Sequence, residues 1–362
     1  MRGLAAIAAL TLTACPSLAR LPKALEPLPS AAEGMRIKTN DGWELVLIRY
    51  RPSVPAQGLP VLLVHGIGAN GRNMDLDASH SLARWLAERG RESFVLDLRG
   101  AGHSDAPAPQ RGRPFGYTMD THASEDLPAA LAAIREVTGS PRVDYIGHSM
   151  GGLVGYIYLA RGGQGLNAVV TMGSPVRLNW GGHTEWLVRA AAPLVGPLKK
   201  LPMTVLAEAS YATYWQINPP IDLVLYNPEN IEPETWDKLM AVGASNIYGG
   251  VIRQFATWVK RGTMVSDDGA IDYLERLAKR REPPLLVVAG KVDHLAPVQS
   301  VRAGFDVYGG QKDFFVAGEE NGLEHDYGHM DLVIGDRAPR ELFPRLLRFL
   351  DGHAPAGKGE GR

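Results

Sequence analysis

Cysteine is nearly absent from this chain. Its 362 residues include one, Cys15, so no internal disulfide can form and no group of thiolates can hold a metal. The sequence also lacks the HExxH run of zinc metalloproteases. We therefore predict that the protein needs no metal and no other cofactor.

An excess of charge of one sign is missing as well. The 38 Lys and Arg residues nearly balance the 39 Asp and Glu residues, and the basic residues are scattered rather than clustered. We therefore expect no nucleic-acid partner. A hydrophobic content of 45% over this length suffices for one large domain or two medium ones.

No apolar run is long enough to cross a bilayer as a helix. The run from Leu4 to Leu12 is short and follows Arg2, which is typical of an export signal. Two endings of this signal are open. Ser17-Leu18-Ala19 fits the cleavage site of ordinary signal peptidase, whereas Leu12-Thr13-Ala14-Cys15 resembles the bacterial lipobox, in which the cysteine becomes the lipidated first residue.

We favour the lipobox because the sole cysteine falls where a lipobox would place it. The protein is then exported and held at the cell envelope by a lipid on Cys15. In the alternative, Cys15 is a free cysteine inside a discarded signal, and the protein is periplasmic or secreted. The lipid anchor is the only association with membranes that we expect.

Strand-like runs alternate with helix-like runs from about residue 35, which is typical of an α/β fold with a mostly parallel sheet. The alternation stops between 177 and 282, where prolines interrupt a stretch rich in Trp, Tyr and Leu, and there we predict an inserted helical cap. The expected division is a signal or lipobox segment over 1–19, a Pro/Ala-rich tether over 20–34, the core over 35–176 and 283–352, the cap over 177–282 and a polar tail over 353–362.

Gly147-His148-Ser149-Met150-Gly151 matches the pattern G-x-S-x-G. It follows a strand-like run, Val143 to Ile146, and precedes a helix-like run that starts at Met150, which is the context this motif requires. A sharp turn there would expose the serine at a helix N-terminus, where the helix dipole favours an oxyanion. The alternative is a glycine-rich turn that merely contains a serine. We assign Ser149 as the nucleophile.

The loop after the apolar run Val61 to Val64 reads His65-Gly66-Ile67. In G-x-S-x-G hydrolases this loop supplies one backbone N–H to the oxyanion hole, here that of Ile67, and the residue after the nucleophile, Met150, supplies the second. We expect His65 to brace the loop rather than to transfer protons.

The same loop also permits an interpretation from another class of protein. Gly66 to Gly71 matches G-x-G-x-x-G after a strand, and Asp97 ends the next strand, about where a ribose-binding acid belongs. A dinucleotide-binding domain is therefore the main rival. It leaves Ser149 and the C-terminal histidines unexplained, and a lone glycine fingerprint is a weak signal.

The acid and the base should follow the serine in that order. Asp293 comes just after the strand-like run Leu285 to Ala289 and is the obvious acid. The other position for an acid, after the run Ala168 to Met172, reads Gly173-Ser174-Pro175-Val176 and contains no carboxylate, which strengthens Asp293.

The base must be a histidine downstream of Asp293. We favour His329, which follows a glycine shortly before the final helix, over His325, which is flanked by Glu324 and Asp326. His353 lies in the polar tail and is a poor candidate. The expected triad is therefore Ser149, Asp293 and His329.

Together these segments resemble the α/β-hydrolase superfamily. The resemblance implies the α/β-hydrolase fold, with a mostly parallel central sheet, flanking helices and an inserted cap. The segments that carry it are Leu63-Val64-His65-Gly66, Asp97 to Ser104, Gly147 to Gly152, Ala289 to Asp293 and Gly328-His329-Met330-Asp331.

The last of these runs and the cap are similar to lipase-like and polyhydroxyalkanoate-synthase-like members. The synthases use cysteine as nucleophile, so the serine here implies hydrolysis of an ester rather than chain building. An acyltransferase on the same fold is the alternative, and a non-catalytic anchored module is a third interpretation. The oligomeric state is left open.

The cap also bears on the substrate, because a cap inserted there would lie over Ser149. Part of its apolar surface must pack on the core, and we expect the remainder to line an apolar acyl site for a small-molecule or lipid-like ester. The large apolar residues that it carries include Trp180, Trp186, Leu187, Leu194, Leu198, Leu201, Tyr211, Tyr214, Trp215, Phe255 and Trp258.

Overall fold

The computed structural model describes residues 32–177, 198–205, 207 and 222–355. Cys15 and the whole export signal lie outside these described residues. Several of the cap residues singled out above also lie outside them, namely Trp180, Trp186, Leu187, Leu194, Tyr211, Tyr214 and Trp215. Within the described ranges, none of the helices has the length and hydropathy needed to cross a membrane.

Eight strands of the described residues form one large sheet in the order β1-β2-β4-β3-β5-β6-β9-β10. Strands β1 and β2 form an antiparallel hairpin, and β2 pairs antiparallel with β4. From β4 to β10 every neighbouring pair is parallel, which confirms the predicted mostly parallel sheet. The strands are β1 (Ala32–Lys38), β2 (Glu44–Tyr50), β3 (Val61–Val64), β4 (Ser93–Asp97), β5 (Val143–His148), β6 (Leu166–Met172), β9 (Leu285–Gly290) and β10 (Lys312–Ala317).

The central strand β3 shows why its sequence is apolar without interruption. Leu62 and Val64 belong to the core on one face of the sheet, whereas Val61 and Leu63 belong to the core on the other face. All four side chains are fully buried. A parallel strand that is covered on both sides has no face left for polar residues.

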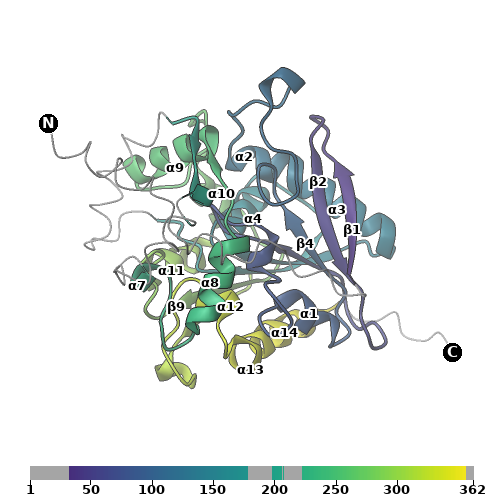
Figure 1. Cartoon of the computed structure of the whole chain (residues 1–362), viewed down its shortest axis with the longest axis vertical. Helices are drawn as coiled ribbons and strands as arrows, with labels where there is room; N and C mark the ends of the chain where they lie inside the picture. The colour runs from purple at the N-terminus through teal and green to yellow at the C-terminus, as the bar shows by residue number, and fades with distance from the viewer. Residues whose placement is uncertain (1–31, 178–197, 206, 208–221, 356–362) are drawn as a thin grey trace, which may run out of the picture.

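Helices cover both faces, giving three layers (Figure 1). One core lies between the sheet and α3 (Leu127–Thr138), α4 (Met150–Ala160), α10 (Tyr273–Lys279) and α11 (Val298–Val307). The other lies between the sheet and α1 (Leu82–Ala87), α12 (Asp331–Ile334), α13 (Ala338–Glu341) and α14 (Phe343–Gly352).

The described part of the inserted segment is not purely helical. Strands β7 (Lys200–Leu201) and β8 (Ile247–Tyr248) pair as a small antiparallel sheet, an addition to the helical cap that the sequence predicted. Helical residues of this segment before α10 occur at 203–205 and 207 and in α7 (Asp222–Leu225), α8 (Pro233–Val242) and α9 (Gly249–Arg261).

The expected domain boundaries move in two places. Helix α10 packs against α4 and α11, so it flanks the sheet rather than belonging to the cap, although it lies within 177–282. Strand β1 starts at Ala32, inside the expected tether, because Ala32 already pairs with Tyr50 of β2. Both differences depend on packing partners that local composition does not reveal.

Candidate active site

Ser149 lies on the sharp turn between β5 and α4. Its backbone has φ 52° and ψ −117°, and among the described residues other than glycine it alone has a positive φ. Such a conformation costs about 1–3 kcal/mol and persists only where its surroundings enforce it. Here the Ser149 amide donates to the Met172 carbonyl at 2.8 Å, and the Ser174 hydroxyl donates to the Ser149 carbonyl at 2.9 Å.

The glycines of the motif are required by close contacts. A Cβ at Gly147 would lie 2.5 Å from backbone atoms of Gly151 and Gly152, and a Cβ at Gly151 would lie 2.2 Å from the Val64 carbonyl oxygen. Any side chain at either position would therefore force β5, α4 and β3 apart. The motif context that the sequence predicted is present: strand, strained serine, helix.

The loop after β3 lies beside Ser149. A Cβ at Gly66 would lie 3.2 Å from the Ser149 Cβ, so only glycine leaves this space open. Ile67 and Met150 border the same cavity as Ser149. Within the described part of the chain, neither of their amides donates a hydrogen bond to another protein group. Met150 is also the first residue of α4, where the helix dipole favours negative charge.

His329 and Asp293 form a buried pair. The Nδ1 of His329 lies 2.7 Å from Oδ2 of Asp293, and both side chains are almost fully buried. The other carboxylate oxygen accepts from the amides of Leu295 at 2.9 Å and Ala296 at 2.7 Å. Because a carboxylate only accepts, His329 carries its proton on Nδ1, and Nε2 is left as the basic nitrogen.

Ser149 and the His329–Asp293 pair meet at one cavity. Ser149 and His329 both line it, but no hydrogen bond joins the Ser149 hydroxyl to the His329 ring in this part of the structure. Such bonds are often loose before substrate binds and tighten in the complex. The structure therefore brings the predicted acid and base together directly and places the predicted nucleophile at the same cavity.

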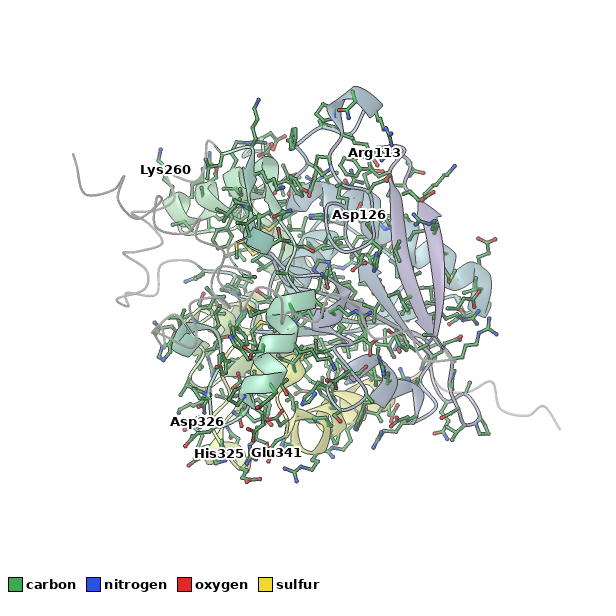
Figure 2. The ribbon with its side chains drawn as sticks, viewed as in Figure 1. Arg113, Asp126, Lys260, His325, Asp326 and Glu341 are labelled. Carbon is green, nitrogen blue, oxygen red and sulfur yellow. The ribbon has the colours of Figure 1, made fainter. Side chains whose placement is uncertain are left out.

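The competing assignments lie elsewhere. The His325 ring is partly exposed and lies 3.9 Å from the carboxylates of Glu229 and Glu324, and Figure 2 shows it at the edge of the molecule. Gly173 occupies the other position considered for the acid. A Cβ there would lie 3.3 Å from Oδ2 of Asp293, so the alternative site adjoins the pair but holds no carboxylate.

The cavity over Ser149 is apolar and has a volume of about 290 Å³. Apart from Ser149 and His329, every described residue that lines it is apolar, and the described part of the inserted segment contributes about half of these residues. These apolar residues are Ile67, Met119, Met150, Leu153, Pro175, Leu201, Ile247, Ile252, Phe255, Ala256, Val259 and Leu295.

A family model for the alpha/beta hydrolase fold matches residues 60–304. The chain belongs to the α/β-hydrolase family. This confirms the fold class that the sequence predicted, and it agrees with the sheet order and the serine turn described above.

Individual relatives of this α/β-hydrolase are distant. The chain is 19% identical to a poly(3-hydroxyalkanoate) polymerase subunit of Haloferax mediterranei over 88% of its own length and 64% of the polymerase. It is 31% identical to human lipase member K over 33% of each chain. A thermophilic esterase from Thermogutta terrifontis has a TM-score of 0.60 at 20% identity, covering 89% of this chain and 100% of that chain. The chain thus spans under two thirds of the polymerase, and the esterase likeness shows the fold alone.

The glycine fingerprint of this hydrolase does not open a long helix. Gly66 to Gly71 continues into a single 3₁₀ turn, η2 (Gly71–Asn73), and the next α-helix begins only at Leu82. The Asp97 carboxylate already has hydrogen-bond partners in the adjacent loops: it accepts from the amides of Gly71 at 2.7 Å and His103 at 2.9 Å. The dinucleotide-binding interpretation therefore lacks the helix and the free acid that it needs.

His65 braces this loop, as expected. Its Nδ1 lies 2.8 Å from the Gly66 carbonyl oxygen, and its Nε2 accepts from the Leu98 amide at 3.2 Å. Burial lowers the pKa of His65, in keeping with a neutral ring that donates through one nitrogen and accepts through the other.

Two further positioning residues were not predicted. Asn73 Oδ1 accepts from the Gly66 amide at 3.2 Å and lies 3.0 Å from His148 Nδ1. Asp331 accepts from the amides of Gly328 at 2.8 Å and Asn227 at 3.1 Å, and burial raises its pKa to about 6. The sequence signal for Asp331 was its position two residues after His329. Its partner Asn227 lies about a hundred residues earlier in the chain, so the hydrogen bond between them could not be predicted from neighbouring residues.

Proposed function

We propose that this protein is a serine hydrolase that cleaves carboxylic esters with an apolar acyl group. The observation that carries the proposal is the shared cavity. The imidazole held by Asp293 at 2.7 Å and the strained Ser149 both open into one apolar space. A serine that borders a substrate-sized cavity, an oriented imidazole and a carboxylate are the parts that acyl transfer requires.

The chemistry follows from these groups. His329 Nε2 accepts the proton of the Ser149 hydroxyl while Oγ attacks the ester carbonyl carbon, and Asp293 stabilises the imidazolium that forms. The amides of Ile67 and Met150 stabilise the oxyanion. His329 then returns the proton to the departing alcohol, which leaves an acyl-enzyme on Ser149. Water, deprotonated by His329, attacks this ester; the bond between the acyl carbon and Oγ breaks, and His329 returns the proton to Ser149 as the acid leaves.

The apolar lining supports an apolar acyl group. Each methylene buried in such a site contributes about 0.8 kcal/mol. Lipases and esterases are among the chains similar to this one, in keeping with an ester substrate. The rate constant kcat/KM should therefore rise from acetate to medium-chain esters.

An acyltransferase is the second candidate, supported by the similarity to poly(3-hydroxyalkanoate) polymerases over most of this chain. The two functions share every step up to the acyl-enzyme and differ only in whether water or another hydroxyl attacks it. An added acceptor alcohol would raise turnover strongly in a transferase and weakly in a hydrolase.

The decisive experiment uses Ser149→Ala with a fluorophosphonate probe and a panel of p-nitrophenyl esters. The wild-type protein should be labelled and should hydrolyse the esters without an acceptor, and the variant should lose both properties while keeping its thermal unfolding temperature. Full activity in Ser149→Ala would end the proposal. Absence of both labelling and turnover in the wild type would favour a non-catalytic module.

A further inference from the structure

Helix α9 forms one wall of the apolar cavity. Ile252, Phe255, Ala256 and Val259 line the cavity, and their spacing places them on one face of the helix. We call this the pocket face. Gly250, Gln254 and Trp258 recur every four residues on the opposite side, which we call the anchored face.

The two ends of the anchored face are fastened to neighbouring segments. The Gly250 amide donates to the Phe115 carbonyl at 3.2 Å, and a Cβ at Gly250 would lie 2.0 Å from the Tyr117 carbonyl oxygen. The indole of Trp258 donates to the Val265 carbonyl at 2.6 Å. The first turn of α9 therefore lies directly on the backbone that leads into α2 (Met119–Thr121).

The middle of the anchored face is tied by a pair of reciprocal hydrogen bonds. The fully buried Gln254 donates from Nε2 to Oδ1 of Asp120 at 2.6 Å, and its Oε1 accepts from the Asp120 amide at 3.3 Å. The same Nε2 lies 3.2 Å from the Val265 carbonyl. A buried amide with both ends occupied specifies one register, because any shift leaves polar groups unpaired.

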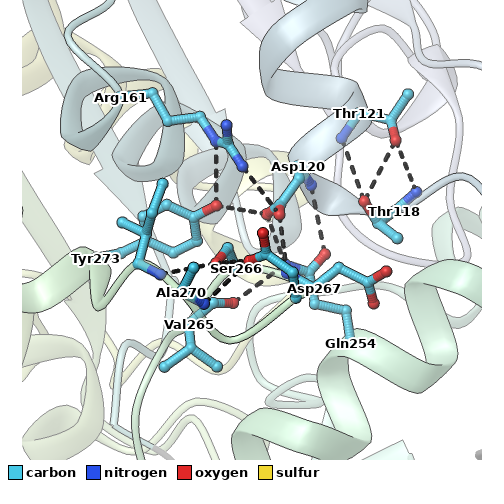
Figure 3. A network of polar contacts seen from close by, with 12 residues as sticks. Thr118, Asp120, Thr121, Arg161, Gln254, Val265, Ser266, Asp267, Ala270 and Tyr273 are labelled. Carbon is cyan, nitrogen blue, oxygen red and sulfur yellow. Dashed lines mark hydrogen bonds and ion pairs between the residues drawn. The ribbon is translucent and has the colours of Figure 1, made fainter.

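Asp120 collects donors from several elements of the core (Figure 3). The Tyr273 hydroxyl of α10 donates to Oδ1 at 2.7 Å, and Arg161, at the end of α4, donates to Oδ2 at 3.1 Å. The Asp267 amide donates to Oδ2 at 2.9 Å. With Gln254, the carboxylate thus joins α9 to α4 and α10, while the adjacent Met119 lines the cavity itself.

We propose that Asp120 is a positioning residue that sets the acyl chain-length preference by holding the pocket face of α9 at a fixed depth. This inference rests on the proposed ester hydrolysis. Asp120 does not line the cavity, and Ser149, Asp293 and His329 are held by β5, β9 and their own loops. Loosening α9 should therefore weaken contacts with the acyl chain but leave the chemistry intact.

The test measures kcat/KM for p-nitrophenyl acetate and hexanoate. Full burial gives about a fourfold gain for each methylene, so a well-formed wall favours hexanoate strongly. In Asp120→Ala and Gln254→Leu the hexanoate-to-acetate ratio should fall about tenfold, with acetate changed by less than about threefold. Asp120→Asn keeps one acceptor oxygen and should lie between these variants and the wild type.

A matched control is Asp267→Asn. The Asp267 carboxylate pairs with Arg253, an exposed residue of α9. The variant therefore removes an ion pair from the same helix and leaves the buried hydrogen bonds between Asp120 and Gln254 in place. Exposed ion pairs contribute little to stability, so the hexanoate-to-acetate ratio of this variant should stay at the wild-type value.

Two outcomes would overturn the proposal. One is an unchanged hexanoate-to-acetate ratio in variants that unfold at a lower temperature, which would make the network purely structural. The other is strict additivity of the effects of Asp120→Ala and Gln254→Leu on the hexanoate-to-acetate ratio in a double-mutant cycle.

If Asp120→Ala does not fold, Tyr273→Phe provides a second test. It removes one hydrogen bond to the same carboxylate and by itself should lower the hexanoate-to-acetate ratio. A wild type without acetate hydrolysis would instead defeat the proposed function.

Discussion

The His148 ring packs against the His329 ring, with centroids 4.7 Å apart, and its Nε2 lies 3.1 Å from the His329 carbonyl oxygen. His148, the residue before Ser149, therefore braces His329. Burial and the neighbouring His329 hold the pKa of His148 well below 6.5. A neutral ring has one N–H, so His148 can donate either to this carbonyl or to Asn73 Oδ1, 3.0 Å from its other nitrogen.

We predict that His148→Leu lowers kcat about tenfold to a hundredfold with little change in KM, because a displaced base costs rate rather than binding. His148→Gln keeps an N–H donor and should recover part of the loss. Steady-state kinetics on a short ester distinguish the variants. Equal kcat values for His148→Leu and the wild type would show that the contact between the His148 and His329 rings does not position His329.

The base itself is tested by comparing two histidines. His329→Ala should lower kcat by about a thousandfold or more, because among the described residues that line the cavity His329 is the one side chain able to take the serine proton. His325→Ala should have little effect, since that ring is partly exposed and lies beside glutamates. A large loss in the His325 variant alone would reverse the assignment.

A third prediction concerns pH and His80, which ties the α8 region to the core. Its Nδ1 lies 2.9 Å from Asp77, and its Nε2 lies 2.8 Å from Asp336. Lys238 of α8 donates to Asp77 at 2.9 Å, and the Thr235 hydroxyl lies 3.5 Å from Nε2. Burial alone would lower the pKa of His80, but the two carboxylates outweigh it and the pKa is raised above 6.5.

Because the folded pKa of His80 is raised, its stabilisation is fully present below pH 6.5 and is lost as the pH rises through the raised value. The pKa of Asp77 is lowered from 3.8, so the contribution of that group is lost as the pH falls below this range. The gap in unfolding temperature between wild type and His80→Leu should be largest between about pH 4 and 6.5. A gap that widens above pH 8 would contradict this.

The fourth prediction concerns the export signal, which lies outside the described residues. The run Leu12 to Cys15 predicts an acylated Cys15 and partition of the protein with membranes. Cys15→Ala should release the protein from the membrane fraction without changing the activity of the catalytic core. Mass spectrometry of the native protein distinguishes the lipid anchor from ordinary cleavage, since a mature N-terminus at Arg20 or nearby would exclude the anchor.

The sequence predicted the serine turn well because its requirements are local. Gly147 and Gly151 are needed where three backbones meet, and strand-like and helix-like runs on either side mark the change of direction. The apolar run of β3 predicted a strand covered on both faces for the same reason. The chain order of serine, acid and base narrowed the remaining candidates to Asp293 and two histidines.

The sequence favoured His329 over His325 by its neighbours, Gly328 and Met330 rather than Glu324 and Asp326, but it could not show which ring meets the acid. The tertiary structure places the His329 ring, and not the His325 ring, 2.7 Å from Asp293. The boundary of the cap could not be predicted from the sequence either, because the amphipathic pattern of α10 does not show whether its apolar face packs against the cap or against α4.

By itself, the sequence determined the fold class, the turn that carries Ser149 and the presence of an inserted segment, because each depends on residues adjacent in the chain. Only the tertiary structure decided that His329 pairs with Asp293, that His148 and Asp331 brace the loop of His329, and that Asp120 ties α9 to the core. These contacts join residues as far apart as 134 and 181 positions. Their geometry is set by how the layers pack, which no local pattern of residues encodes.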